Sequence, residues 1–119
     1  MSNRKPDRAQ DAAAAAAEPA ASAIQRLDPL LQHPSRLGAL VLLSSADALT
    51  FRRLKELLRE TDGNLGAQLR KLEDAGYVAV NKEFLDRKPV SWYALTGKGQ
   101  RALKAHLAAL ESVIRSVDV

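Results

Sequence analysis

Residues 61–78 read TDGNLGAQLRKLEDAGYV, and the hydrophobic pattern changes twice within them. The first three residues interrupt a helical pattern, and a new helix is expected from Asn64 to Ala75. Gly76 suits the left-handed conformation that often follows a helix, and after it the apolar period changes from 3.6 to two. The leucines that would bury one face of this helix are Leu65, Leu69 and Leu72.

The residues before this segment predict two further helices. FRRLKELLRE, residues 51–60, carries one apolar stripe, and Thr50 offers an oxygen that can cap its N-terminus. A helix that is apolar almost all round is expected to begin at Pro34 and to form the buried centre of the domain. Two short amphipathic helices joined by a tight glycine-containing turn are typical of a helix-turn-helix unit.

The residues after Gly76 predict a β-hairpin. Residues 77–84 alternate as a strand does, residues 85–88 form a polar turn, and residues 90–95 are rich in strand-forming side chains. Pro89 should lie at the start of the second strand or on an edge, because it has no N–H to donate.

A last helix is expected from Gly97 to about Val117, with Thr96 as its cap. It would be about 30 Å long, which is longer than so small a domain needs. Its apolar residues follow the spacing of an a/d seam, which suits either internal packing or a dimer interface: Leu103, Leu107, Leu110, Ile114 and Val117.

The first 22 residues differ from the rest in composition. They contain six consecutive alanines and equal numbers of acidic and basic side chains, so we expect a disordered tail or a fraying helix. Residues 23–119 then form the folded domain and carry the whole net charge of +4, which suits a polyanionic partner. The tail has no secretory signal pattern, and no stretch is apolar enough to span a membrane, so no membrane partner is expected.

The chemistry-bearing residues predict neither an enzyme nor a metal site. The chain has no cysteine, which fits a reducing cytoplasm, and its sequence contains no nucleophile elbow or glycine-rich phosphate loop. Its two histidines, His33 and His106, fall on different helices and are expected at the surface or at helix ends. We therefore expect no cofactor and no bound metal, although a site shared across a dimer could use His106.

Two segments together resemble the winged-helix transcriptional regulators of the MarR/ArsR-like superfamily. These are residues 61–78 and residues 87–99, RKPVSWYALTGKG, and the resemblance extends over about residues 30–115. It implies a fold that is mainly α with a small β-hairpin, a winged helix-turn-helix with a long C-terminal helix. It also implies a homodimer that binds double-stranded DNA sequence-specifically, in the cytoplasm at the nucleoid. Nothing in the sequence identifies a small-molecule effector.

The resemblance makes residues 64–76 the recognition helix, which would lie in the major groove. Asn64 and Gln68 can pair with adenine, Lys71 suits a guanine edge or a phosphate, and the small residues allow close approach. An alternative is that Asn64 is only a helix cap and that the other polar residues form a solvated face. The candidate DNA contacts of this helix are Asn64, Gly66, Ala67, Gln68, Arg70 and Lys71.

Residues 84–89 would form the wing, on the flanking backbone or in the minor groove. Arg87 and Lys88 are its candidate contacts, and the alternative is an ordinary charged turn, in which Asp86 weakens the positive field. Lys82 and Arg53 are lesser candidates for phosphate contacts. Trp92 and Tyr93 are adjacent on a strand and should point to opposite faces, with one of them on the core.

A winged helix that binds only another protein, and no DNA, remains the main alternative. Residues 49–91 hold nine basic and seven acidic side chains, so the region that would face DNA is only mildly basic. Its charge by itself favours DNA by a small margin.

Overall fold

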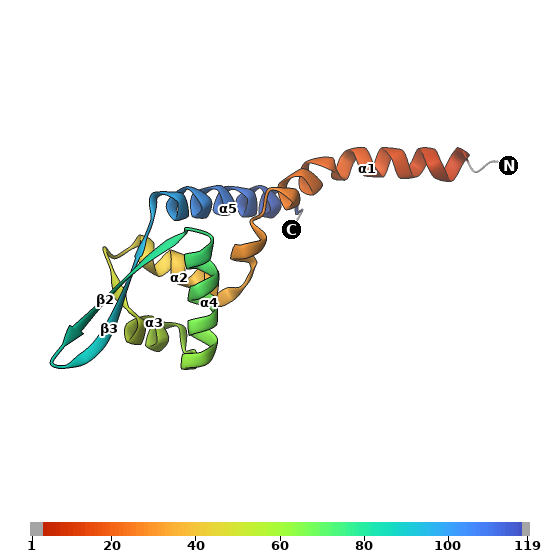
Figure 1. Ribbon diagram of the computed structural model, residues 1–119. Helices are drawn as coiled ribbons and strands as arrows, with labels where there is room; N and C mark the ends of the chain where they lie inside the picture. Colours follow the sequence, from red (N-terminus) through yellow and green to blue (C-terminus); the bar gives the residue numbers. More distant parts are fainter. Residues whose placement is uncertain (1–3, 118–119) are drawn as a thin grey trace.

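The computed structural model describes residues 4–117, and side chains from residue 8 onward. It is mainly helical with one small antiparallel sheet, which confirms the predicted winged helix-turn-helix with a long C-terminal helix (Figure 1). The elements in chain order are α1 (Arg4–Gln25), a 3-10 turn η1 (Pro29–Gln32), α2 (Pro34–Ser44), β1 (Leu49–Thr50), α3 (Phe51–Leu58), α4 (Asp62–Asp74), β2 (Val78–Leu85), β3 (Lys88–Leu95) and α5 (Gly97–Ser116).

The helix-turn-helix unit is formed by α3 and α4, and threonines cap both helices. Thr50 Oγ1 accepts a hydrogen bond from the Arg53 N–H, and Thr61 accepts one from the Asn64 N–H. The prediction that α4 begins at Asn64 is wrong, because Asp62 and Gly63 already belong to its first turn. The left-handed residue that ends α3 is Arg59, with φ 54°, not Gly63.

The sheet has the order β1-β3-β2, and all neighbours are antiparallel. The hairpin turn consists of Asp86 and Arg87, both at positive φ, which is the two-residue turn that matches the twist of paired strands. β3 therefore begins at Lys88, earlier than predicted. Pro89 lies within it, where β1 has already ended and the outer edge of β3 is free.

The core forms around α2, which packs against α3, α4 and α5. As the sequence predicted, the three leucines of α4 are buried on this side. The largest fully buried aliphatic side chains are Leu31, Leu40, Leu54, Leu65, Leu69 and Leu72.

The alanine-rich segment, for which disorder or a fraying helix was expected, forms the helix α1. This helix continues through the expected domain boundary at residues 22 and 23, since alanine has the highest helix propensity. Ala23 at its end is fully buried, and the end packs along α5 while the rest extends away from the body (Figure 1). Among the residues described, no helix combines the length and the apolar character that a membrane crossing requires.

Candidate nucleic-acid interface

The N-terminal end of α4 and the hairpin tip lie at the end of the molecule opposite α5 (Figure 1). A groove runs between α4 and the sheet, with Gly66, Ala67 and Arg70 of α4 on one side together with Asp62 and Glu73. Lys82 of β2 and Tyr93 of β3 line the other side. Helix and hairpin therefore present one continuous surface.

The exposed face of α4 carries small and basic side chains. Ala67, Arg70 and Lys71 are exposed, and Gly66 is half-exposed. A Cβ added at Gly63 or Gly66 would meet no described atom within 4 Å, so the helix backbone is open to a partner there. This is the face that its buried leucines predict, because it lies on the opposite side of the helix.

Gln68 lies elsewhere than expected. It is buried, its Oε1 accepts a hydrogen bond of 2.5 Å from Arg36 Nη1, and Arg36 Nε donates to the carbonyl of Leu30 at 2.5 Å. Position 68 is only about 60° around the helix from Leu65, so it belongs to the inner side. Gln68 thus joins α4 to α2, and no local pattern in the sequence indicates Arg36 as its partner.

Asn64 is exposed but already has partners at the edge of α4. Its Nδ2 donates to Glu60 Oε1 at 2.6 Å, and its Oδ1 is 3.4 Å from Gln68 Nε2. Ser35 of α2 donates to the other oxygen of Glu60. Asn64 is not the helix cap, since Thr61 has that role.

Ion pairing lowers the negative charge close to α4. Asp62 Oδ1 lies 2.7 Å from Lys55 Nζ, so the one carboxylate in the first turn of α4 has a cation from α3 beside it. The Arg53 guanidinium, a lesser phosphate candidate, lies 3.3 Å from Glu56 on its own helix.

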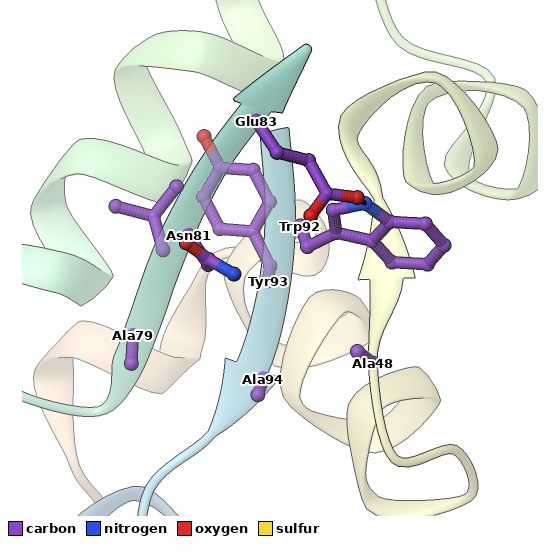
Figure 2. A pocket seen from close by; sticks show the side chains of 8 residues that line it. Ala48, Ala79, Asn81, Glu83, Trp92, Tyr93 and Ala94 are labelled. Atoms are coloured by element: carbon purple, nitrogen blue, oxygen red, sulfur yellow. Dashed lines mark hydrogen bonds between the residues drawn. The ribbon is translucent and has the colours of Figure 1, made fainter. Parts of the chain in front are cut away.

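The two faces of the hairpin carry different side chains, with Lys82 facing α4 and Glu83 and Lys88 on the other face. The register places Glu83 and Trp92 on the face away from α4, where Trp92 Nε1 donates to Glu83 Oε1 at 2.7 Å. Tyr93 points the other way, as Figure 2 shows, and shares the α4-facing groove with Lys82. Arg87 and Lys88 are exposed at the tip.

Tyr93 packs between the sheet and the helix-turn-helix unit. Its ring centroid is 6.5 Å from that of Phe51. Burial raises the pKa of Tyr93, the nearby Glu73 adds to this, and Arg70 opposes it. Arg70 lines the groove near Tyr93, whereas Lys71 is not among the residues that line it.

His106 is buried, contrary to the expected place at the surface or at a helix end. Its Nδ1 accepts a hydrogen bond of 2.9 Å from the Asp28 N–H, and Asp28 Oδ2 accepts one of 2.5 Å from the Tyr77 hydroxyl. The bond to Asp28, together with burial, raises the pKa of Tyr77 to about 12. This chain of contacts joins α5 to Tyr77, which lies between α4 and β2. No group of three or more potential metal-ligating side chains occurs among the described residues.

The predicted a/d residues of α5 are partly buried in the chain's own core and partly exposed to solvent. Leu103 is buried in the chain's own core with His106 and Ala109, and Leu110 is half-buried. Leu107, Ile114 and Val117 remain exposed, at 43%, 67% and 56%. Only part of the predicted seam is therefore free to meet a second chain.

Comparison with known proteins identifies relatives of this fold. A family model described as winged helix DNA-binding domain matches residues 35–114. An uncharacterised protein of Methanocaldococcus jannaschii is 31% identical over 83 residues, covering 70% of this chain and 90% of that protein. A transcriptional regulator homologue from Pyrococcus horikoshii is 29% identical with a TM-score of 0.75, covering 86% of this chain and 99% of that one.

A zinc-responsive MarR family member of Lactococcus lactis, ZitR, has the same fold, with a TM-score of 0.53 and 23% identity over 69% of this chain and 56% of its own. The chain belongs to the winged helix DNA-binding domain family, and its structural neighbours are MarR-family transcriptional regulators.

Proposed function

We propose that this protein is a sequence-specific regulator of transcription that binds double-stranded DNA as a homodimer. The observation that carries the proposal is the shared surface of α4 and the hairpin. Small residues leave the α4 backbone open, and basic side chains stand on both sides of the groove. In this proposal residues 64–76 occupy the major groove, and the wing, residues 84–89, contacts the flanking backbone or minor groove.

The distribution of charge supports DNA over a protein partner. Residues 49–91 hold nine basic and seven acidic side chains, so their charge balance is positive by two. Asp62 is paired with Lys55, and Glu83 is held on the far face by Trp92. Arg70 and Lys71 of α4, Lys82 beside the groove and Arg87 at the tip then offer positive charge that suits phosphates, although Glu73 lines the same groove and Asp86 adjoins Arg87.

Each candidate residue has a proposed role. Lys71 contacts a guanine edge or a phosphate, Arg70 contacts a phosphate across the groove, and the Ala67 methyl meets a thymine methyl. Gly66 allows the backbone to approach. Gln68 acts indirectly, by holding α4 against Arg36, and Asn64 reaches bases only if it exchanges its bond with Glu60.

The second copy is proposed to pack on α1 and α5. The radius of gyration is 20.0 Å, whereas a compact chain of this length has roughly 14 Å, because α1 extends from the body. Ile24 of α1 and Leu107 and Ile114 of α5 expose apolar surface beside this extension. Two-fold pairing there would place two α4 helices about 34 Å apart, one turn of DNA. We infer that the protein acts on the nucleoid in the cytoplasm and has no catalytic activity.

The test is a DNA-binding titration over a salt series. Duplexes selected from a random pool should bind, and log K should fall linearly with log salt concentration. The double variant Lys71→Ala, Arg87→Ala should lose most of its affinity and show a shallower salt slope, with its helical circular dichroism unchanged. A matched control is Arg101→Ala, Lys104→Ala, which removes two exposed cations from α5. Absence of any complex at low salt, or an equal loss in the control, would contradict the proposal.

A further inference from the structure

Phe84, next to the hairpin tip, has the most exposed of the large hydrophobic side chains described, at 75%. Its partner in the strand register is Pro89, which is also exposed. An exposed aromatic ring on a strand adds little to the fold and favours aggregation, so it points to a contact made with a partner.

The register settles which way this ring faces. Residues two apart on a strand share a face, so Phe84 lies on the same face as Lys82 and Val80. Both of those residues line the groove against α4. By the same register Leu85, the next residue, lies on the opposite face. Figure 2 shows Glu83 and Trp92, which belong to that face. Phe84 therefore extends the proposed DNA-binding face outward from α4.

The neighbouring charges identify the partner. Lys82 is on the same face as Phe84, and Arg87 is in the adjoining turn, while the hydrogen bond to Trp92 keeps the Glu83 carboxylate on the other face. A ring flanked by cations suits a polyanion that also offers apolar surface. The minor groove of DNA does so, because sugar edges line its walls and it is only about 6 Å wide, which admits side chains but not a hairpin.

We propose that Phe84, supported by Pro89, inserts its ring into the minor groove beside the α4 site and packs against the deoxyribose edges. The inference rests on the proposed function, and it adds to DNA affinity an apolar contribution that basic residues do not supply. An apolar contact releases no counterions, so its contribution to affinity should be nearly independent of salt, unlike that of Arg87.

The experiment measures duplex affinity at several salt concentrations for the full chain and three variants. Phe84→Ala should weaken binding about tenfold, or about 1.4 kcal/mol, at every salt concentration, with the same salt slope as the wild type. Phe84→Leu should recover part of the loss. Leu57→Ala, which truncates an apolar side chain of α3 that is 46% exposed and lies outside the wing, is the matched control and should change affinity less than twofold. Thermal unfolding should be unchanged in all three, since both side chains are exposed.

Several results would overturn the inference. If Phe84→Ala binds as tightly as the wild type, or if its salt slope falls by about one as a lost phosphate contact requires, the ring has no such role. An equal loss in Leu57→Ala would show that the loss is not specific to the ring, and a changed oligomeric state in Phe84→Ala would assign the ring to a protein contact. If the wild type binds no duplex, the proposed function fails together with this inference. Wild-type binding with no effect of Phe84→Ala removes the inference alone.

Discussion

The two ends of this molecule expose different chemistry. At the end formed by α4 and the hairpin, small side chains and the basic side chains of Arg70, Lys71 and Arg87 are exposed, with Asp62 paired to Lys55 and Glu83 on the other face of the hairpin. Glu73 also lines the groove there, and Asp86 lies in the turn. At the end formed by α1 and α5, aliphatic side chains such as Ile114 stand in solvent, and α1 extends past the body (Figure 1). One end suits a charged polymer, and the other suits an apolar surface.

Because the two ends expose such different side chains, we expect this small domain to bind two partners, DNA at one end and a second copy of the chain at the other. The core buries the leucines of α2, α3 and α4 within one chain, so the helix-turn-helix unit needs no second copy to form. The exposed aliphatic side chains of α5 have no such function inside the chain. We expect substitutions at the α4 and hairpin end to lower DNA affinity directly. Substitutions at the α1 and α5 end should lower DNA affinity by weakening the dimer.

The largest effect is expected from breaking the apolar end. Leu107→Lys with Ile114→Lys should convert a dimer to a monomer, because two charges would be buried at the proposed interface. Losing the second half-site should lower DNA affinity by about 100-fold or more. Sedimentation velocity and a binding titration measure the two effects.

The matched control for this variant is Ala105→Lys with Ala108→Lys, which adds the same charge to exposed positions of α5 away from the apolar residues. It should remain a dimer. A double-lysine variant at 107 and 114 that stays dimeric would refute the assignment of these residues to the interface.

An intermediate effect is expected at the buried edge of the DNA-binding end. Gln68→Ala would leave the Arg36 guanidinium without its acceptor on α4, which should lower the free energy of unfolding by about 1 to 3 kcal/mol. Urea unfolding measures this, with exposed Gln100→Ala as the control. Unchanged stability, with a loss of DNA affinity as large as that of Lys71→Ala, would instead show that Gln68 contacts bases.

The smallest effect is expected at the contact that links the two ends. Tyr77→Phe removes the hydrogen bond to Asp28 and should cost about 1 kcal/mol at neutral pH. The folded protein holds the Tyr77 proton more tightly than the unfolded chain does, since the pKa rises from 10.0 to about 12. This stabilisation is therefore present below pH 10 and is lost as the pH rises toward 12.

The measurement is urea unfolding of both proteins between pH 8 and about pH 12. Because Tyr93 titrates in both, its contribution largely cancels in the difference between them. That difference should shrink above pH 10. A difference that stays constant across this range would show that the Tyr77 hydroxyl does not stabilise the fold through its proton.

Local patterns in the sequence were sufficient to predict most of the helices and strands. Thr50 and Thr96 cap the helices that they were expected to cap, and Gly76 adopts the positive φ that its position predicted. The strand β1 was missed, because two residues are too few to show a period. The start of α4 was misplaced since glycine is tolerated in a first helical turn, and Arg59 took the left-handed position instead.

Local sequence patterns predicted the order of the helices of the helix-turn-helix unit, the hairpin and the last helix, the buried leucines of α4 and the family, because periodicity, caps and turn residues act over a few neighbouring positions. Only the tertiary structure decided which polar side chains were free to meet a partner. Gln68 accepts a hydrogen bond from Arg36, 32 positions away, and His106 accepts one from the N–H of Asp28, 78 positions away. Leu103 turns into the core while Leu107 stays exposed. Such choices depend on contacts between distant segments, and a linear pattern cannot contain them.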